Sequence, residues 1–318
     1  MKRVLVFGGD TGVMATRVSN ALTELEWAHP LFADTRRPAM LNAHVEQVPL
    51  IITSPQAMMD AMRDVDAVIS CVENNPDLIR QSATALFNAA QRFPEKRVVL
   101  FSSMAVYGGQ EGVLDESAAL NAADDYAAAR IDAESMAANS NTVCLRGGVE
   151  YGPGSARWSG LIARLLMSKR LGDLGAAGDG YCNLLFMDDL VDAMIKSLQL
   201  TGMQHQVFNL CSSERITWNE YLIRYGVALG AVPVKRISRR RLKFETRLAI
   251  PLKIAELMLG QSNAARLHVP APISPAMIRT FNQRILMNTS KAEHLLGMKW
   301  TPLQTGLQTA AEWVRRMK

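Results

Sequence analysis

A tyrosine stands four residues before an arginine in the stretch DDYAAAR, residues 124–130. The surrounding sequence is rich in alanine and free of proline, so it predicts a helix over about 122–138. Residues four apart share one face of a helix, which would place Tyr126 beside Arg130. An arginine beside a phenol favours its ionised form, because the guanidinium keeps its charge. The alternative is an ordinary surface tyrosine on an alanine-rich helix.

The stretch GGDTGVMA, residues 8–15, follows an apolar run and opens a predicted helix. Gly9, Gly12 and Ala15 recur at intervals of three. Glycine lets the chain turn tightly and approach a pyrophosphate, which the helix N-terminus then holds, while the third position needs only a small residue. We therefore predict a dinucleotide site, and the alternative is a tight turn without a ligand. The predicted contacts in this stretch are Gly8, Gly9, Thr11, Gly12 and Val13.

The residues after the second predicted strand bear on the choice of dinucleotide. Asp34 ends that strand, where an acid could bind the hydroxyls of the adenosine ribose. Arg36 and Arg37 follow, and arginine is suited to bidentate contacts with a 2′-phosphate. The two interpretations compete because Asp34 would repel that phosphate, and a solvated turn is a further alternative for the arginines. We expect NADP or NAD, with a slight preference for NADP.

The elements that must position these residues follow from alternating apolar and amphipathic stretches, a pattern typical of βαβ units around a parallel sheet. Continuous apolar runs predict strands buried on both faces at residues 3–8, 30–34, 65–72, 96–103 and 141–148. Helices are expected from Gly12 to about Leu25, at 77–92 and at 122–138. Cys71 and Val72, at the end of the third run, are included among the predicted cofactor contacts.

Helices dominate after YGPG, residues 151–154. They are expected at 217–230, 242–260, 290–296 and 303–316, and 206–212 is expected to be a strand that returns to the sheet. The fold class is therefore α/β, with a Rossmann-type doubly wound parallel sheet and a smaller, mostly helical C-terminal domain. We expect the dinucleotide-binding domain at 1–150, with returning pieces near 182–212, and a discontinuous substrate domain at 151–181 and 213–318.

Five segments resemble those of a known family, in the family's order. LFSSMAVYGG (100–109) closely resembles the Ser-Ser-x-x-Val-Tyr-Gly signature of the extended short-chain dehydrogenase/reductase family, also called the NAD-dependent epimerase/dehydratase family. LRGGVEYGPG (145–154) is similar to its Leu-Arg-Pro-x-x-Val-Tyr-Gly-Pro-Gly segment, and LLFMDDLVDAM (184–194) to its Val-His-Val-x-Asp-Leu segment. VFNLCSSERITWNEY (207–221) and NTSKAEHLLGMKWTPLQTGL (288–307) resemble its last third.

This resemblance implies roles for three residues. Ser103 would orient the substrate, Tyr126 would be the catalytic acid/base, and Arg130 would stand where the family has a lysine. Hydride would pass between the nicotinamide and a substrate carbon that bears a hydroxyl or carbonyl, while the tyrosine exchanges the oxygen's proton. The resemblance also implies a homodimer through a four-helix bundle that uses the helices near 77–92 and 122–138.

Several features depart from the family's pattern. Arg130 replaces the lysine, and an arginine does not readily shed a proton into a relay. SCVENNP (70–76) brings Glu73 near the expected path of the cofactor, and Glu150 stands where an apolar residue is usual. These differences argue against a standard sugar-nucleotide epimerase and do not argue against cofactor binding.

The net charge of +5 comes from one segment, because KRISRRRLK (235–243) holds six basic residues and no acid, and the rest of the chain sums to −1. We find neither a recognition motif nor interleaved aromatic residues, so no nucleic-acid partner is expected. The segment could attract an anionic small-molecule substrate or attach loosely to an anionic membrane. A solvated helix start is the plainer alternative.

The composition indicates a globular protein of the reducing cytoplasm. Hydrophobic residues make up 48% of the chain, and no apolar run is long enough for a transmembrane helix. The N-terminus lacks the cleavage site of a signal peptide. The four cysteines are widely spaced, without the pairing of metal ligands, so no metal is expected.

The function predicted from the sequence is NAD(P)-dependent dehydrogenation or reduction of a secondary alcohol or ketone. One alternative is a nucleotide-sugar epimerase or dehydratase. The other is an NAD(P)-binding regulatory protein with little or no turnover, which the substitution at Arg130 supports.

Overall fold

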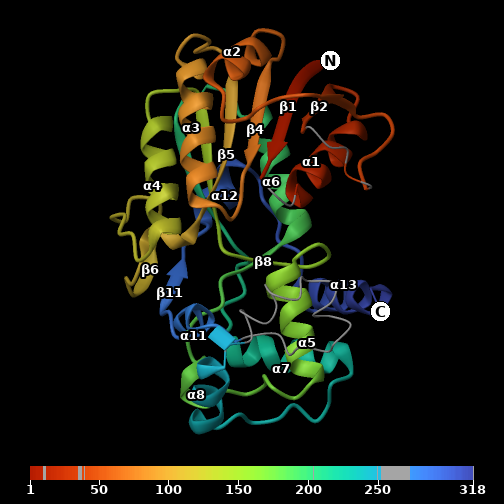
Figure 1. Ribbon diagram of the computed structural model, residues 1–318, viewed down its shortest axis with the longest axis vertical. Helices are drawn as coiled ribbons and strands as arrows, with labels where there is room; N and C mark the ends of the chain where they lie inside the picture. The colour runs from red at the N-terminus through yellow and green to blue at the C-terminus, as the bar shows by residue number, and fades with distance from the viewer. Residues whose placement is uncertain are drawn as a thin grey trace.

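The computed structural model describes residues 1–9, 12–34, 38, 40–202, 204–248, 250, 251 and 273–317. Its main strands are β1 (Lys2–Gly8), β2 (Ala28–Ala33), β3 (Glu46–Val48), β4 (Ala67–Cys71), β5 (Arg97–Ser103), β7 (Thr142–Gly147) and β10 (Gln206–Leu210). They form one parallel sheet in the order β10-β7-β5-β4-β1-β2-β3 (Figure 1). The predicted α/β sheet is confirmed, and the strand expected to return near 206–212 is β10.

Helices cover both faces of this sheet (Figure 1). They are α1 (Val13–Thr23), α2 (Pro55–Arg63), α3 (Pro76–Ala90), α4 (Asp125–Ala137) and α6 (Met187–Gln199). Side chains of β1 alternate between the two faces, as the period of a strand requires. Val4 and Val6 join the apolar core under α1 and α6, whereas Leu5 and Phe7 join the core under α2, α3 and α4.

The order of the strands reverses beside β1, because β1 pairs with β2 on one side and with β4 on the other. In open α/β sheets, ligands bind in the crevice outside the carboxyl ends of the strands at such a reversal. The loop after β1 and the loop after β4 therefore lie where a cofactor would be held.

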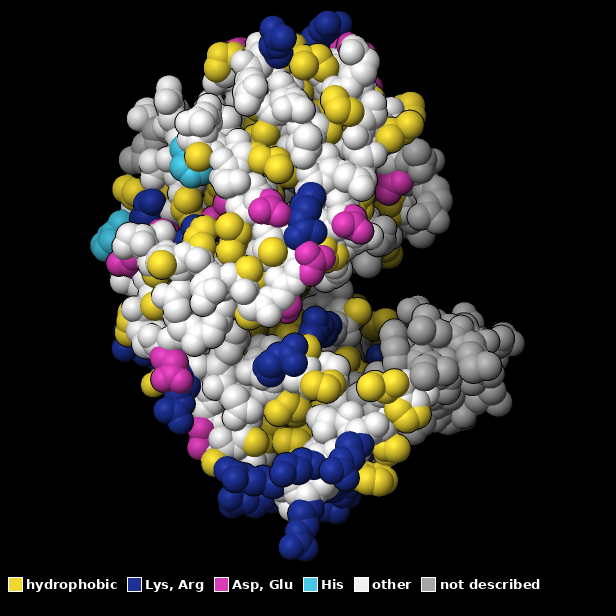
Figure 2. All heavy atoms as spheres, turned by 60° about the vertical axis from the view of Figure 1, so that its left-hand side comes forward, with side chains coloured by type: hydrophobic (Ala, Val, Ile, Leu, Met, Phe, Trp, Pro, Cys, Tyr) yellow, Lys and Arg dark blue, Asp and Glu magenta, His cyan; other side chains and the backbone are white. Residues whose placement is uncertain are grey.

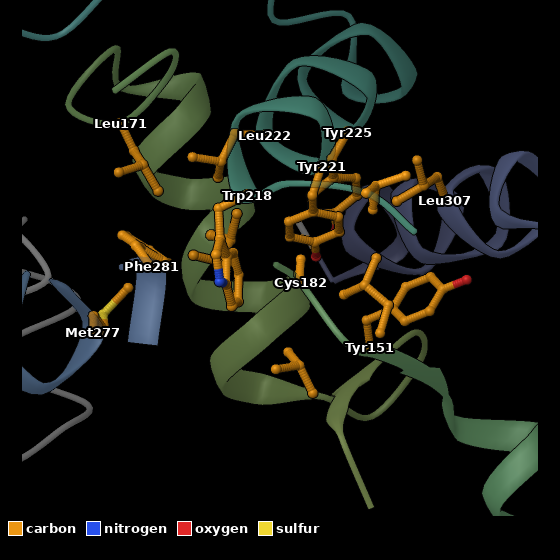
Figure 3. Close-up of a cluster of buried hydrophobic side chains, with 14 of the residues drawn as sticks. Tyr151, Leu171, Cys182, Trp218, Tyr221, Leu222, Tyr225, Met277, Phe281 and Leu307 are labelled. Atoms are coloured by element: carbon orange, nitrogen blue, oxygen red, sulfur yellow. The ribbon is translucent and has the colours of Figure 1, made fainter. Parts of the chain in front are cut away.

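The remaining elements build a second core below the sheet. Its elements and the adjoining short ones are β6 (Gly112–Leu114), β8 (Val149–Tyr151), β9 (Leu184–Phe186), β11 (Ile285–Met287), α5 (Ile162–Met167), α7 (Trp218–Leu229), α8 (Arg239–Arg247), α11 (Pro275–Phe281) and α13 (Leu303–Arg316). The short helix α12 (Ser290–Leu295) instead packs into the core under α1 and α6, where Ala292 is buried. Aromatic rings fill the second core (Figure 3). The ring centroids of Trp218 and Phe281 lie 4.7 Å apart, and those of Tyr221 and Tyr225 lie 5.6 Å apart.

Helices predicted at 217–230, 290–296 and 303–316 correspond to α7, α12 and α13. The helix predicted at 242–260 begins earlier, as α8, because Ser238 caps it by accepting a hydrogen bond from the backbone N–H of Arg241. Residues 252–260 of that prediction lie outside the described residues. The proposed division into two domains stays a prediction.

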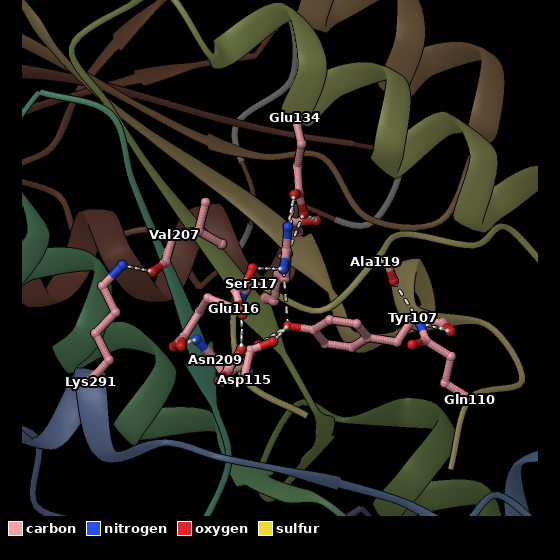
Figure 4. A network of polar contacts seen from close by, with 12 residues as sticks. Tyr107, Gln110, Asp115, Glu116, Ser117, Ala119, Glu134, Val207, Asn209 and Lys291 are labelled. Carbon is pink, nitrogen blue, oxygen red and sulfur yellow. Dashed lines mark hydrogen bonds and ion pairs between the residues drawn. The ribbon is translucent and has the colours of Figure 1, made fainter. Parts of the chain in front are cut away.

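A buried polar network fixes α4 against the sheet (Figure 4). Arg146 of β7 donates to both carboxylate oxygens of Glu134 on α4. Its Nη1 also donates to the hydroxyl of Tyr107, which in turn donates to the amide oxygen of Asn209 on β10 at 2.6 Å. Arg146 and Glu134 are 4% and 6% exposed, so removing either partner would leave a buried charge without compensation.

Candidate functional site

A pocket of about 840 Å³ opens between the carboxyl edge of the sheet and the lower part of the molecule. Figure 2 shows the surface hollowed between these two parts. Its lining includes Val13 after the glycine loop, Ser103 at the end of β5, Tyr126 of α4, Glu150 of β8 and residues 278–280 of α11. One cavity therefore joins the predicted cofactor and catalytic regions.

The glycine loop has the geometry expected of a phosphate-binding turn. Gly12 adopts the left-handed conformation, with φ 58°, immediately before α1. A Cβ placed on Gly8 would lie 3.0 Å from the Cβ of Ala15, so the strand and helix pack too closely there for a larger residue. No side chain of the described residues caps α1, whose N-terminal N–H groups are the kind of donors that bind an anion. These features fit a dinucleotide pyrophosphate. Thr11 lies outside the described residues.

Asp34 and the end of β4 flank this loop. A carboxylate oxygen of Asp34 would lie 4.0 Å from a Cβ placed on Gly12, so the acid faces the glycine loop. A Cβ on Gly9 would lie 3.6 Å from the Val72 side chain, which brings the two loops together. Cys71 is buried, and that burial raises the pKa of its thiol, so the cysteine is a neutral packing group. Arg36 and Arg37 lie outside the described residues.

Tyr126 and Arg130 meet on α4 as their spacing predicted. The Arg130 Nε donates to the Tyr126 hydroxyl at 3.3 Å, and the guanidinium lies 5.2 Å from the centroid of the tyrosine ring. Arg130 is only 1% exposed. Its other two nitrogens donate to backbone carbonyls, one to Phe101 on β5 and one to Glu73 after β4 at 2.9 Å. The arginine therefore supports the phenol from behind and does not itself line the pocket.

Ser103 lines the same pocket as Tyr126. It is the last residue of β5, and its Oγ accepts a hydrogen bond from the N–H of Ala105 at 3.2 Å. The hydroxyl proton remains available to a ligand because the backbone uses only the oxygen as an acceptor. Ser103 and Tyr126 thus line one pocket, and Arg130 supports Tyr126 from outside the lining.

Glu150 also lines the pocket, although the sequence singled it out only as a departure and gave it no role. Its side chain makes no hydrogen bond to another residue of the described chain. Burial raises the pKa of its carboxyl to about 8, and the charge of Glu73 adds to this rise. The positive charges of Arg130 and Arg157 oppose it. Glu150 is therefore mainly protonated at neutral pH.

Three arginines on the pocket wall were not predicted: Arg157, Arg279 and Arg284. None of them lies within ion-pair distance of a carboxylate among the described residues. Glu73, Glu111 and Asp124 line the pocket as well, so the wall carries both signs of charge. Arg157 follows the YGPG motif, and its guanidinium carbon lies 4.8 Å from the centroid of the Trp158 ring. The position of this Arg-Trp pair just after the motif could have identified Arg157 from the sequence.

Tertiary contacts bring Arg279 and Arg284 to this wall. β11 pairs with β6, and the Asn183 amide binds the backbone of Ile285 and Met287, each at 2.9 Å. The Gln283 amide also donates to the carbonyl of Gly108 at 3.2 Å. These bonds join segments that are far apart in the chain, so a local sequence motif could not have predicted them.

The described residues contain neither a membrane-spanning helix nor a cluster of metal ligands. No described helix combines the length and apolar character needed to cross a membrane. No group of three or more His, Cys, Asp or Glu side chains within the described ranges could hold a metal ion.

Comparison with known proteins agrees with the architecture. The sequence model of the NAD dependent epimerase/dehydratase family matches residues 4–211. A UDP-glucose 4-epimerase from Thermotoga maritima, solved with UDP-glucose, is 15% identical, with 99% of each chain covered and a TM-score of 0.74. A UDP-glucuronic acid 4-epimerase from Bacillus cereus, solved with UDP-glucuronic acid and NAD, is 15% identical over 99% of this chain and 100% of the other, with a TM-score of 0.74.

A third solved structure, a putative epimerase from Burkholderia cenocepacia, is 19% identical over 99% of this chain and 98% of the other, with a TM-score of 0.72. At these identities the likeness establishes the shared fold. No curated protein sequence matches the chain.

Proposed function

Because the chain belongs to the NAD-dependent epimerase/dehydratase family, we propose that it oxidises a hydroxyl-bearing carbon of a nucleotide sugar and completes an epimerisation or dehydration in the same pocket. The observation that carries this proposal is the convergence of Ser103 and Tyr126 on a cavity that reaches the glycine loop at Val13. The sequence favoured a simple dehydrogenase or reductase. The comparisons favour its nucleotide-sugar alternative, because similar folds are those of enzymes that act on UDP-sugars.

The glycine loop would hold the dinucleotide. The N–H groups at the start of α1 would bind its pyrophosphate, and Asp34 would accept hydrogen bonds from the adenosine ribose. When bound, the nicotinamide supplies a hydride acceptor. We propose NAD in preference to NADP, since Asp34 faces the loop and a similar structure was solved with NAD. The 2′-phosphate role of Arg36 and Arg37 stays a prediction.

Tyr126 would take the proton of the substrate hydroxyl as the carbon loses hydride, and would return it in the reverse step. Arg130 would stabilise the phenolate through its hydrogen bond and its charge. Ser103 would donate a hydrogen bond to the same substrate oxygen and fix its position. Supporting these roles, Ser103 and Tyr126 line the same pocket and Arg130 donates a hydrogen bond to the Tyr126 hydroxyl.

The three wall arginines would hold the anionic part of the substrate. A diphosphate offers several oxygens to guanidinium groups, which bind such oxygens in pairs. Because Arg157, Arg279 and Arg284 have no acidic partner in the described chain, binding would cost no existing ion pair. A neutral Glu150 would limit repulsion of the diphosphate at neutral pH.

One observation favours a second candidate, a dinucleotide-binding protein without turnover. Each of the three guanidinium nitrogens of Arg130 already donates to the chain itself, and Arg130 does not line the pocket where a nicotinamide ribose would bind. In that case the protein would bind NAD and leave every substrate unchanged.

The test is incubation of the purified protein with NAD and separate UDP-sugars, with products identified by nuclear magnetic resonance. We expect an epimer or a dehydrated sugar from at least one nucleotide sugar and none from the free sugar. The double variant Arg279→Ala/Arg284→Ala should raise KM at least about tenfold with a smaller change in kcat. Arg315→Ala/Arg316→Ala on α13, away from the pocket lining, is the control. Equal turnover of free and nucleotide-linked sugars would contradict the proposed substrate class.

A further inference from the structure

The outer face of α8 is strongly basic. Arg239, Lys243 and Arg247 are spaced by four residues, and Arg240 lies beside them, so all four occupy an arc of roughly 100° around the helix. All four are exposed. None forms an ion pair with a carboxylate in the part of the chain that the structure describes. Figure 2 shows Lys and Arg side chains gathered at the lower end of the molecule, where Figure 1 places α8.

The opposite face anchors the helix to the protein. Leu242 is buried in the aromatic core, and the Glu245 carboxylate is paired with Arg170. Arg241, at the edge of the inner face, donates to the carbonyl of Lys169 at 3.1 Å. The helix is thus held by its inner side chains, and its only acid is turned inward. The four outer cations take no part in these anchoring contacts.

Two large apolar side chains accompany the cations. Phe244 is 61% exposed and lies at the edge of the same arc, next in line after Arg240. Ile250, shortly after the end of the helix, is 71% exposed. Exposing the apolar Phe244 side chain to water is unfavourable, whereas burying it against another apolar surface would be favourable. Figure 2 shows hydrophobic side chains beside the basic group at this end of the molecule.

We propose that the outer face of α8 binds the surface of a membrane that contains anionic phospholipids. The four cations would contact headgroup phosphates, and Phe244 would enter the boundary between headgroups and acyl chains. The inference concerns attachment of the protein, so it does not rest on the proposed function.

A membrane fits these features better than a nucleic acid. The cations cover a convex helix face, whereas single-stranded nucleic acid is bound in a groove with aromatic side chains on which successive bases stack. Phe244 is the one aromatic residue on the described outer face of α8. Because the attraction is between exposed charges, it must weaken as salt shortens the screening length.

The test is sedimentation of the full-length protein with phospholipid vesicles. Neutral vesicles contain phosphatidylcholine alone, and anionic vesicles contain roughly one third phosphatidylglycerol. We expect at least about tenfold stronger binding to the anionic vesicles at low salt, and loss of most of this binding near 1 M salt. Equal binding to both vesicle types would overturn the proposal.

Variants then locate the surface. Arg239→Glu/Lys243→Glu/Arg247→Glu should abolish binding, and Phe244→Ser should weaken it while leaving its salt dependence unchanged. Lys2→Glu/Arg63→Glu/Arg92→Glu makes the same change of net charge at the opposite end of the molecule and should bind as the unmodified protein does. Equal losses in the two triple variants would overturn the α8 assignment. If the full-length protein binds a short RNA or DNA through α8 more tightly than it binds anionic vesicles, the membrane proposal is overturned in favour of a nucleic-acid partner. Unchanged circular dichroism and melting temperature would show that the variants remain folded.

Discussion

Arg130 does more in this structure than a lysine could do at the same position. It is buried, and its three nitrogens bind the Tyr126 hydroxyl and the carbonyls of Phe101 and Glu73. The side chain therefore joins α4 to β5 and to the loop after β4 while keeping positive charge beside the phenol. We interpret the substitution as a rebuilt support for Tyr126 and not as the remnant of a lost site.

This interpretation predicts that Arg130→Lys lowers stability clearly but changes catalysis little. Lysine keeps the charge, so single-turnover hydride transfer should stay within about tenfold of the original rate. An ammonium cannot span the three acceptors, and each buried carbonyl left unpaired costs about 1–3 kcal/mol of unfolding free energy. Denaturant unfolding would measure that loss. Arg130→Ala should lose nearly all hydride transfer, and a lysine variant as stable as the original would contradict the bridging role.

Glu150 makes stability depend on pH. Its carboxyl has a pKa near 8 in the folded protein and an ordinary value of 4.5. Between these values the folded state holds a proton that the unfolded state releases, so this group's contribution to stability falls as pH rises through the interval. Glu150→Gln cannot ionise and should be more stable than the original protein above pH 8, with the difference shrinking toward pH 4.5. If the difference in melting temperature between Glu150→Gln and the original protein stays constant across this pH range, the raised pKa assigned to Glu150 is contradicted.

At the scale of the elements, strands buried on both faces were predictable because they form uninterrupted apolar runs. β4, with all five residues buried, is the clearest case. β3 was missed because it is a three-residue strand at the edge of the sheet with a partly exposed, polar sequence. The pairs β6–β11 and β8–β9 are as short, and their pairing depends on distant segments. Local motifs therefore found Ser103 and Tyr126, whereas Arg279 and Arg284 required the tertiary fold.

The glycine loop gives a prediction at this scale. In Gly12→Val, the side chain would occupy the space proposed for the pyrophosphate and would strain a residue with φ 58°. We expect at least about a hundredfold loss of NAD affinity in isothermal titration. Gly230→Val is the matched control, because Gly230 ends α7 with φ 75° and open space around it, away from the pocket. If both variants bind NAD alike, the loop is only a turn.

At the scale of the whole molecule, the pocket belongs to neither half of the chain alone. Residues 13–158 supply Val13 after the glycine loop, Ser103, Tyr126 and Arg157 to its lining, and residues 276–284 supply Arg279 and Arg284. The aromatic core around Trp218 and Phe281 holds these parts together. The fold class could be predicted from the apolar pattern of the first half. The assembly of one pocket from both parts of the chain could not be predicted, because it depends on contacts between distant segments.

The resemblance to the family predicts a homodimer through α3 and α4, and this stays a prediction. Within the subunit, Arg80 of α3 pairs with Asp125 and Asp132 of α4, so the two helices already form a fixed pair. Thr84 and Met136 are exposed on that pair and touch each other. Light scattering should give twice the subunit mass at micromolar concentration, and Thr84→Arg/Met136→Arg should reduce it. Gln308→Arg/Glu312→Arg on α13 is the control, and a strict monomer would remove the prediction.

The central claim is that Tyr126 exchanges a proton while hydride leaves a nucleotide sugar in this pocket. Its most direct test is nicotinamide absorbance under single turnover, recorded when NAD-loaded protein is mixed with each nucleotide sugar of a panel. We predict a transient rise with at least one of them, and a rate at least about a hundredfold lower in Tyr126→Phe at unchanged NAD affinity. Equal transients in the two proteins would contradict the role of Tyr126. A protein that binds NAD and the nucleotide sugars but changes neither absorbance nor product would contradict catalysis itself.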